Sequence, residues 1–417
     1  MKKIFLAALS LLVVCAIAVN TAGCTLNVRA TDLMDGVTPR DLAVGDTSDE
    51  GNANVTDFAV RLFRAANESG KNTLVSPLSV LCALAMTANG AEGETREQME
   101  RVLGMSVEEL NLYLRAYLGA LPQGDQYKLS IANSVWFSDA GDFTVNEDFL
   151  QTNADYYGAD AYKAPFDKKT LRDINRWVKS KTDGMIPEIL DQIPSYAVMY
   201  LVNALAFEAQ WMDVYEKKQV KDGVFTTQDG EKQSVSMMYD SAYLKYLEDE
   251  KAKGFVRYYS GKKYAFVALL PNEGISVSEY VGSLDGASLN TLLAEAKSKP
   301  VQTAIPKFKT EYCTEMSELL KSMGMPLAFD ADQADFSGLG TVKNGNICIT
   351  SVLHKTFIQV GEKGTRAGAA TVIEMTKNSA EIETPEQVFL DRPFVYMLID
   401  CENNVPFFIG TMMDVNG

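Results

Sequence analysis

Among the residue types that can act as nucleophile, general base or metal ligand, histidine and cysteine are scarce in this chain. There is one histidine, His354, and it lies in an alternating apolar and polar pattern that is typical of a strand. One histidine cannot build the usual multi-histidine metal sites, and no G-x-S-x-G, H-E-x-x-H or glycine-rich phosphate-binding motif occurs. We therefore interpret His354 as a core residue and expect no cofactor, no metal and no enzymatic activity.

The six cysteines show no paired spacing. Cys15 and Cys24 belong to the N-terminal region, and the other four are scattered along the chain: Cys82, Cys313, Cys348 and Cys401. Without a C-x-x-C pair, neither a disulfide framework nor a zinc site is expected. Three of the four lie in apolar runs, which predicts buried and unreactive thiols at Cys82, Cys348 and Cys401.

A long segment near the C-terminus could take part in chemistry as the substrate of another enzyme. Residues 361–380 have the sequence GEKGTRAGAATVIEMTKNSA and lie between two segments predicted as strands. Structureless loops of this length are uncommon in compact domains and are usually functional. After Gly368 the turn-forming residues are replaced by small and β-branched residues, which favour an extended strand. The pattern therefore predicts an exposed loop that can also form a strand.

The alternation of side chains within this loop separates charged from uncharged residues. In an extended strand alternate side chains share a face. One face would carry uncharged and mostly small side chains: Thr365, Ala367, Ala369, Thr371, Ile373 and Met375. The charged Arg366 and Glu374 fall on the other face, so one face could be buried without burying a charge. A solvated loop that happens to alternate would explain this pattern equally well.

The elements that must position the loop are helical in the first part of the chain and extended later. Apolar residues at spacings of three and four predict helices over 55–67, 77–88 and 95–103. Apolar and β-branched segments predict five strands: 128–136, 197–207, 264–270, 347–360 and 394–400. The mixture indicates an α+β fold with large sheets. No linker, repeat or low-complexity block interrupts residues 54–417, which we predict to form one domain.

The N-terminus has the pattern of a targeting segment. Two lysines precede an apolar run over residues 4–19, which is too short to span a bilayer comfortably. The sequence T-A-G-C that ends at Cys24 resembles a bacterial lipobox, which predicts a signal peptide over residues 1–23 and a lipid on the Cys24 thiol. Thr21 departs from the usual leucine, so cleavage and secretion without lipid is the alternative.

The segment that follows, residues 24–53, is rich in Asp, Gly and Thr and is predicted to be a tether between the lipid anchor and the domain. The chain is thus expected to cross the inner membrane and to be held at the bacterial cell envelope or surface, or otherwise to be extracellular. Its net charge of −16, without a Lys/Arg-rich run, argues against binding to nucleic acid or polyanionic sugars. We expect a monomer that meets the membrane only through the lipid anchor.

Ordered motifs from residue 54 to the C-terminus resemble the serpin family. They are Asn72–Ser79, Leu201-Val202-Asn203 leading to Trp211, Leu269–Pro271, Ile305–Phe308, Ala334–Gly338, Glu362–Thr365, Asp391–Phe394 and Pro406–Gly410. The resemblance implies a helix-rich single domain with three β-sheets and an exposed reactive-centre loop from roughly Glu362 to Pro385.

The resemblance also implies a function. A serpin offers its loop to an endopeptidase as a suicide substrate, and the cleaved loop enters the main sheet as a new strand while the acyl-enzyme persists. The expected target is a serine protease, with the cysteine class left open. A noninhibitory serpin-fold binding or carrier protein, whose loop is cleaved without trapping the protease, is the alternative.

Several residues receive roles from the resemblance. The hinge comprises Glu362, Gly364, Thr365, Arg366, Ala367, Gly368, Ala369, Ala370 and Thr371. A hydrogen-bonded cluster beneath the main sheet, where its strands must separate, comprises Ser76, Ser79, Asn203 and His354. Trp211 lies where loop insertion begins, although a plain core aromatic would explain it equally well, and Lys307 is expected to pair with Glu362.

The scissile bond is ambiguous by one residue. Counting from Glu362 with the commonest family spacing places it at Asn378–Ser379, and a register one residue shorter places it at Lys377–Asn378, which would suit a trypsin-like enzyme. Val372, Ile373, Met375 and Thr376 would suit elastase-, chymotrypsin- or subtilisin-like enzymes.

Two hinge positions depart from the family pattern. Arg366 stands where inhibitory serpins usually have Glu, and Gly368 stands where Ala is common. Arg366 would stay on the solvent face, while the flexibility of Gly368 could slow insertion. No proline or run of bulky or charged residues occurs between Gly364 and Met375, which favours the inhibitory interpretation.

Overall fold

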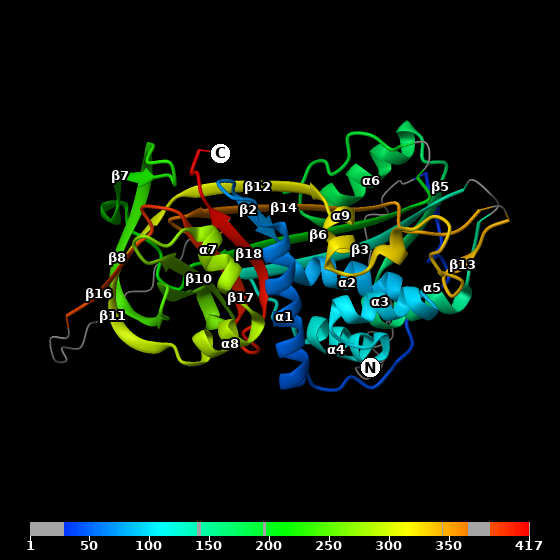
Figure 1. Ribbon diagram of the computed structural model, residues 1–417, viewed down its shortest axis with the longest axis horizontal. Coiled ribbons are helices and arrows are strands. Elements are labelled where there is room, and N and C mark those ends of the chain that lie inside the picture. The colour runs from blue at the N-terminus through cyan, green and yellow to red at the C-terminus, as the bar shows by residue number, and fades with distance from the viewer. Residues whose placement is uncertain (1–28, 140–142, 195–196, 344, 366–383, 417) are drawn as a thin grey trace, which may run out of the picture.

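The computed structural model describes residues 29–139, 143–194, 197–343, 345–365 and 384–416 (Figure 1). The fold is α+β, as predicted, and the strands in these ranges form three sheets. None of the described helices is both long and apolar enough to cross a membrane. The signal peptide, Cys24 and the loop residues 366–383 lie outside the described residues.

A seven-stranded sheet has four long strands, β3, β6, β12 and β14, that run along the long axis in Figure 1. In spatial order its strands are β1 (Thr31–Asp32), β5 (Asp160–Ala164), β3 (Tyr127–Ser138), β6 (Met199–Gln210), β15 (Gly364–Thr365), β14 (Ser351–Gly361) and β12 (Phe308–Glu315). We call it the main sheet. Its central strands β3, β6 and β14 carry the long apolar stretches that predicted strands in this part of the chain.

A nine-stranded sheet packs against one end of the main sheet, and a two-stranded ribbon completes the β-structure. The nine strands are β16 (Glu386–Phe389), β11 (Lys297–Pro306), β8 (Lys232–Glu248), β9 (Ala252–Tyr258), β10 (Tyr264–Pro271), β17 (Phe394–Asp400), β18 (Pro406–Met412), β2 (Thr73–Val75) and β7 (Val220–Thr226), of which β7 pairs with β8 alone. The ribbon pairs β4 (Thr144–Val145) with β13 (Gly340–Thr341). The strand predicted over 394–400 has the bounds of β17.

The helices cover both faces of the main sheet. They are α1 (Asp49–Ala66), α2 (Pro77–Ala88), α3 (Gly93–Leu103), α4 (Val107–Ala120), α5 (Glu147–Tyr157), α6 (Lys168–Lys181), α7 (Val277–Ser283), α8 (Gly286–Ala294) and α9 (Ser317–Met323), with short 3₁₀ turns at Lys217–Gln219, Ser260–Lys262 and Pro326–Phe329. Every residue of α2 is buried, and the helix begins at Pro77, where a missing N–H costs nothing. It therefore lies at the centre of the core beneath the main sheet.

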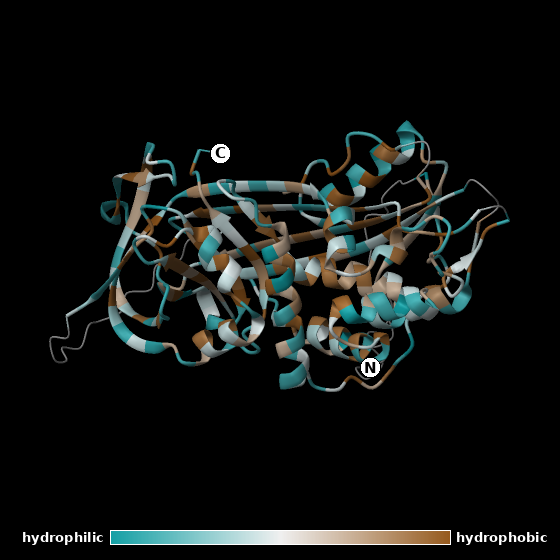
Figure 2. Ribbon diagram, viewed as in Figure 1, coloured by the Kyte–Doolittle hydropathy of each residue, from teal (hydrophilic) through white to brown (hydrophobic). Residues whose placement is uncertain are grey.

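Two hydrophobic cores lie on opposite faces of the main sheet. The larger one fills the space between the main sheet, α2 and the nine-stranded sheet. In the smaller one Ile174, Trp177 and Val178 of α6 pack against Trp136 and Tyr200 on the outer face. Figure 2 shows hydrophilic residues on the exposed side of α6 and hydrophobic residues on the strands beneath it. Because its apolar face is covered by the sheet, the residues of α6 that are classed as exposed are all polar.

The folded body begins before the predicted boundary at residue 54. Helix α1 starts at Asp49 because Ser48 caps it, accepting a hydrogen bond from Gly51 N–H. Residues 29–48, which were expected to be part of a tether, contact the body: β1 pairs with β5, and Arg40 forms an ion pair with Asp155, whose side chain is fully buried. This part of the segment is therefore fixed to the body.

Candidate functional site

Strands β6 and β14 are separated at one end of the main sheet by two residues of the hinge, Gly364 and Thr365. Gly364 and Thr365 form β15, which pairs antiparallel with Gln210 and Ala209 of β6 on one side. On the other side the same two residues pair with Gly361 and Val360 of β14. The side chain of Thr365 is 1% exposed, and its hydroxyl hydrogen-bonds to the Tyr259 hydroxyl. The hinge has thus already begun a strand between β6 and β14.

Gly364 is required for this geometry. Its φ is +144°, a backbone conformation that L-residues rarely adopt, and a Cβ at this position would lie 2.0 Å from the Ala209 carbonyl oxygen. Any side chain would therefore push β15 away from β6.

Trp211 holds the turn that precedes β15. Its indole N–H donates to Gly361 O at 2.8 Å, and its backbone N–H donates to Lys363 O at 2.9 Å. Tyr215 N–H donates to Glu362 O at 3.0 Å. The indole also stacks on Tyr259 with a centroid separation of 4.5 Å. Trp211 is therefore a core aromatic that also positions the hinge, so the two interpretations offered for it are compatible.

Glu362 and Lys307 form the expected ion pair at the same end of the main sheet. Lys307 Nζ lies 2.7 Å from Glu362 Oε2. The hydrogen bond from Lys307 holds the pKa of the Glu362 carboxyl below its usual value. Because the two side chains are 39% and 42% exposed, solvent screens the pair and its contribution to stability is modest.

Further along the main sheet, β6 and β14 pair directly with each other. The pairing is parallel and joins residues 200–204 to residues 351–355, with His354 opposite Asn203. A strand that continued β15 would have to replace these pairs. This direct pairing is therefore the part of the sheet that loop insertion would open.

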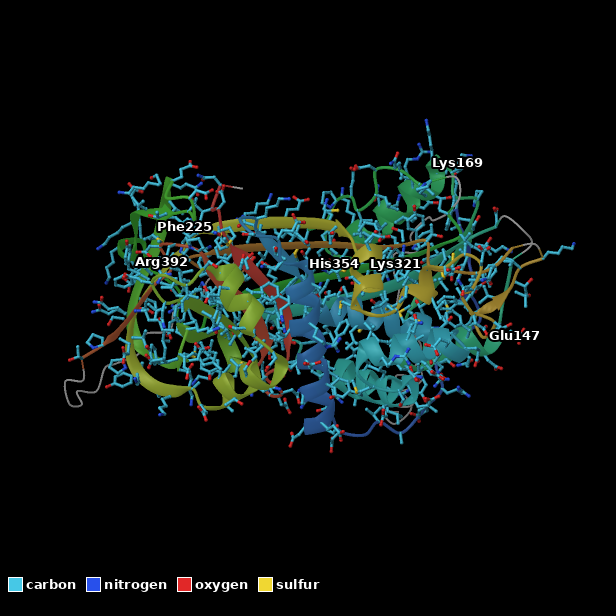
Figure 3. All side chains as sticks on the ribbon, in the orientation of Figure 1. Glu147, Lys169, Phe225, Lys321, His354 and Arg392 are labelled. Atoms are coloured by element: carbon cyan, nitrogen blue, oxygen red, sulfur yellow. The ribbon has the colours of Figure 1, made fainter. Side chains whose placement is uncertain are left out.

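The residues predicted to form the hydrogen-bonded cluster meet beneath this pairing, near the centre of the molecule (Figure 3). Ser76, Ser79, Asn203 and His354 are each at most 3% exposed. His354 Nε2 accepts a hydrogen bond from the backbone N–H of Ser76 at 3.0 Å. Burial lowers the pKa of His354 to about 3, so the imidazole is neutral and can accept this bond.

The expectation of hydrogen bonds among these four side chains is not met in the uncleaved chain. Ser76 Oγ, Ser79 Oγ, Asn203 Oδ1 and His354 Nδ1 are buried without a protein hydrogen-bond partner. Ser76 contributes its backbone N–H in place of its hydroxyl, because it lies at the N-terminus of α2, where that N–H lacks an intrahelical acceptor. The four residues are together in space, but their polar groups are only partly satisfied.

Two residues of this region were not anticipated. Asn133 on β3 accepts a hydrogen bond from the Asn203 side chain, and the Thr356 hydroxyl donates to Leu74 O at 2.7 Å. Both are buried polar residues on strands, and a buried polar side chain needs a hydrogen-bond partner, which is the signal that could have identified them.

The described cysteines resemble structural thiols more than nucleophiles. Cys82 is fully buried and Cys401 is partly buried, and burial raises the pKa of each thiol to about 12. Cys348 is also buried, whereas Cys313 is exposed. Within the described ranges no three His, Cys, Asp or Glu residues gather as they would around a metal ion.

The hinge residues Arg366, Ala367, Gly368, Ala369, Ala370 and Thr371 and the candidate reactive-bond residues Lys377, Asn378 and Ser379 lie outside the described residues. The described chain resumes at Thr384 and forms β16, which pairs in parallel with residues 301–304 of β11. Lys307, just after β11, pairs with Glu362, just before β15, so β15 and β16 lie at the same end of the molecule. The expected loop therefore leaves and rejoins the body at that end.

Comparison with known proteins places these features in a family context. A family model described as "Serpin (serine protease inhibitor)" matches residues 53–415. A serpin-like protein of Thermococcus kodakarensis is 30% identical over 369 residues, which cover 86% of this chain and 84% of that protein. The leukocyte elastase inhibitor of Equus caballus is 30% identical over 362 residues, covering 82% and 93%. The solved structure of the thermophilic serpin tengpin in its native state is 46% identical, with a TM-score of 0.89, covering 93% and 100%.

Proposed function

The chain belongs to the serpin family, and from this membership we propose that it inhibits a serine endopeptidase as a suicide substrate. The observation that carries the proposal is the position of Gly364 and Thr365 between β6 and β14. In the proposed reaction the serine hydroxyl of the protease attacks the carbonyl of the scissile bond. The peptide bond breaks, its nitrogen leaves protonated on the C-terminal fragment, and an ester joins the protease to the loop.

The register of β15 predicts where each loop residue would lie after insertion. Continuing the antiparallel pairing from Thr365 would place Ala367 between Phe207 of β6 and Ile358 of β14. Phe207 is 3% and Ile358 is 1% exposed. The uncharged face of the loop would therefore be the face that enters the core, as Thr365 already does.

The same register gives a role to the polar residues under the sheet. Thr371 would lie between Asn203 and His354, the positions at which Asn203 Oδ1 and His354 Nδ1 lack a partner before cleavage. Insertion would bring the Thr371 hydroxyl beside these atoms, and burying a polar group with a partner is less costly than burying it alone. The unsatisfied atoms therefore favour the inserted state over the uncleaved one.

The register also accounts for the unusual Arg366. On the outer face it would lie opposite Glu208 of β6, and Glu208 is already opposite Lys128 of β3. Opposite charges on directly facing residues stabilise a sheet modestly. Arginine at this position would therefore complete a row of alternating charges in the inserted sheet.

The experiment that tests the proposal is incubation of the protein with trypsin, elastase, chymotrypsin, subtilisin and papain. We expect an SDS-stable complex with at least one serine protease, release of a C-terminal peptide whose mass identifies the scissile bond, and a higher melting temperature of the cleaved protein. Cleavage by every enzyme without a complex and without a rise in melting temperature would refute the proposal and support a noninhibitory carrier.

We also propose that the protein works at the bacterial cell envelope, held there by a lipid on Cys24. The support is the T-A-G-C sequence after the apolar N-terminal run. Mass spectrometry of the protein purified from membranes of its own cells should show a lipidated N-terminal cysteine. An N-terminus at another residue, without lipid, would refute the anchor and leave the inhibitory proposal untouched.

A further inference from the structure

The exposed face of α6 carries only cationic residues and one serine. Its exposed positions are Lys168, Lys169, Arg172, Arg176, Lys179 and Ser180. The chain has no contiguous Lys/Arg-rich run, as expected, but six of the 14 residues of this helix are Lys or Arg. They were overlooked because they are spaced by three and four residues, which places them on one helix face instead of in one contiguous stretch.

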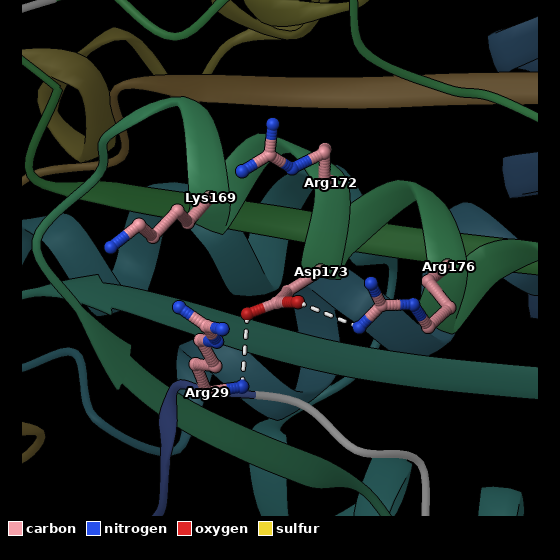
Figure 4. A pocket seen from close by; sticks show the side chains of 5 residues that line it. All are labelled: Arg29, Lys169, Arg172, Asp173 and Arg176. Carbon is pink, nitrogen blue, oxygen red and sulfur yellow. Dashed lines mark hydrogen bonds and ion pairs between the residues drawn. The ribbon is translucent and has the colours of Figure 1, made fainter.

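A shallow pocket of about 280 Å³ lies between this face and the first described residue of the chain (Figure 4). It is lined by Arg29, Lys169, Arg172, Asp173 and Arg176. The one carboxylate among them, Asp173, is 4% exposed, and its two oxygens accept from Arg29 N–H and from the Arg176 guanidinium, each at 3.0 Å. Its charge is thus compensated locally, and the pocket presents a positive surface.

Two neighbouring acidic side chains, Asp167 and Asp160, also have hydrogen-bond or ion-pair partners. Asp167 caps α6 and accepts from the N–H groups of Lys169 and Thr170, while Asp160 pairs with Lys181 at 2.8 Å. The stripe from Lys168 to Lys179 extends for about 16 Å along the helix. Although the chain has a net charge of −16, the surface along this helix is positively charged.

The position of Arg29 indicates what could meet this patch. Arg29 N–H is bonded to α6 through Asp173, and Arg29 follows Cys24 by five residues. Five residues span at most about 17 Å, so a membrane anchored through Cys24 would lie within that distance of the cationic face. The apolar face of α6 is covered by the main sheet, so contact with a membrane would be electrostatic, without insertion into the lipid.

We infer that the cationic face of α6 binds the headgroups of anionic phospholipids, with a lipid phosphate held in the pocket beside Arg29. The net negative charge of the rest of the molecule does not prevent this, because salt screens charges beyond about 10 Å. In Figure 1, α6 and β16 lie toward opposite ends of the long axis. A protein bound through α6 would thus hold the end that carries the reactive loop away from the bilayer.

The test uses the chain from residue 25 onward, which retains the whole described body and carries no lipid, so its outcome does not depend on lipidation. Binding is measured by co-sedimentation with phosphatidylcholine vesicles, with and without about 30 mol % phosphatidylglycerol, at about 0.1 M salt. We expect binding to the anionic vesicles alone. The double variant Lys169→Gln, Arg172→Gln should weaken binding to the anionic vesicles about 25-fold, since each cation near an anionic surface raises the affinity about fivefold.

A matched control removes two exposed lysines at the other end of the molecule, with Lys221→Gln and Lys232→Gln on β7 and β8, and should change binding less than twofold. A second pair on the same face, Lys168→Gln with Lys179→Gln, should repeat the loss, and melting temperatures verify that each variant is folded. Equal binding to neutral and anionic vesicles, or equal losses in the α6 and control pairs, would overturn the inference. Binding to duplex DNA or heparin without binding to vesicles would overturn it in favour of a soluble polyanion.

Discussion

Exchanging the residues at positions 366 and 367 would test whether the loop inserts in the register that β15 begins. The double variant Arg366→Ala with Ala367→Arg has the composition and net charge of the native chain, but its guanidinium moves by one residue. In the proposed register, position 366 faces Glu208 and Gln359 on the outer side of the sheet, both of which are accessible to solvent. Position 367 faces the core.

The expected effect follows from the burial of the two core neighbours of position 367. Phe207 is 3% and Ile358 is 1% exposed, so an arginine between them would have no solvent and no described counter-charge on that side. Burying an unpaired ion costs several kcal/mol. A barrier raised by only about 3 kcal/mol slows insertion about 150-fold. Insertion competes with hydrolysis of the ester, so the variant should be cleaved as a substrate and should release active protease.

The assay measures the fraction of cleaved inhibitor that remains in an SDS-stable complex with whichever protease the native protein traps. The single variant Arg366→Ala should retain most of the complex, since it removes a charge from the exposed face. The variant Ala367→Gln adds bulk without charge and should lie between the native protein and the exchange variant. If the exchange variant traps protease as efficiently as the native chain, the register and the burial of this face are wrong.

Three further outcomes follow from the hinge and from the core beneath it. Glu362→Lys would place two ammonium groups where Lys307 now pairs with a carboxylate, and the direct loss of stability is about 1 kcal/mol or less. We nevertheless expect more prematurely inserted or polymeric protein, measured by size-exclusion chromatography. Unchanged monomer yield and inhibition would contradict this. Burial lowers the pKa of His354 from 6.5 to about 3, so between these pH values the unfolded chain binds a proton that the folded chain does not. The contribution of His354 to the free energy of unfolding is therefore fully present above pH 6.5. It falls by about 1.4 kcal/mol per pH unit as the pH drops toward 3. Urea midpoints at two pH values should show a smaller fall for His354→Gln, and identical slopes would refute the assignment. Trp211→Phe removes the hydrogen-bond donor to Gly361 O and should lower the free energy of unfolding by about 1 kcal/mol, measured by thermal unfolding. Inhibition should also be lost faster when the variant is warmed. An unchanged rate of this loss would show that ring stacking alone holds the turn.

Elements with a strong local pattern were predicted well from the sequence. Helix α2 has the predicted bounds because a largely apolar stretch follows Pro77, and β17 has its predicted bounds because seven consecutive buried residues form it. Helix α1 was predicted six residues too late, because its first turn is polar and depends on the Ser48 cap. The contact between Arg40 and Asp155 joins residues 115 apart, and no periodicity in either segment predicts it.

Within the described residues, His354 lies beside Ser76 and Asn203 as expected, but their bonding could not be predicted. Similarity to a motif identifies Ser76 and His354 as neighbours, yet it cannot tell that the backbone N–H of Ser76 is the donor. Asn133 was missed because its partner Asn203 belongs to another strand, and the pairing of strands distant in sequence is set by the whole fold. The cationic face of α6 was missed because a contiguous run was sought where helical spacing was the relevant pattern.

The geometry at Gly364 has a consequence for how such a protein could change over generations. Every amino acid other than glycine adds a Cβ, and at this position a Cβ would lie 2.0 Å from Ala209 O. A single missense mutation in this codon would therefore leave the folded body and the protease-recognition sequence intact while displacing the first paired residue of the new strand. If the chain traps proteases as proposed, descendants with such a change would still be cut by the same proteases but would no longer arrest them. Residue 364 is thus a position at which a lineage could pass in one step from inhibitor to decoy substrate.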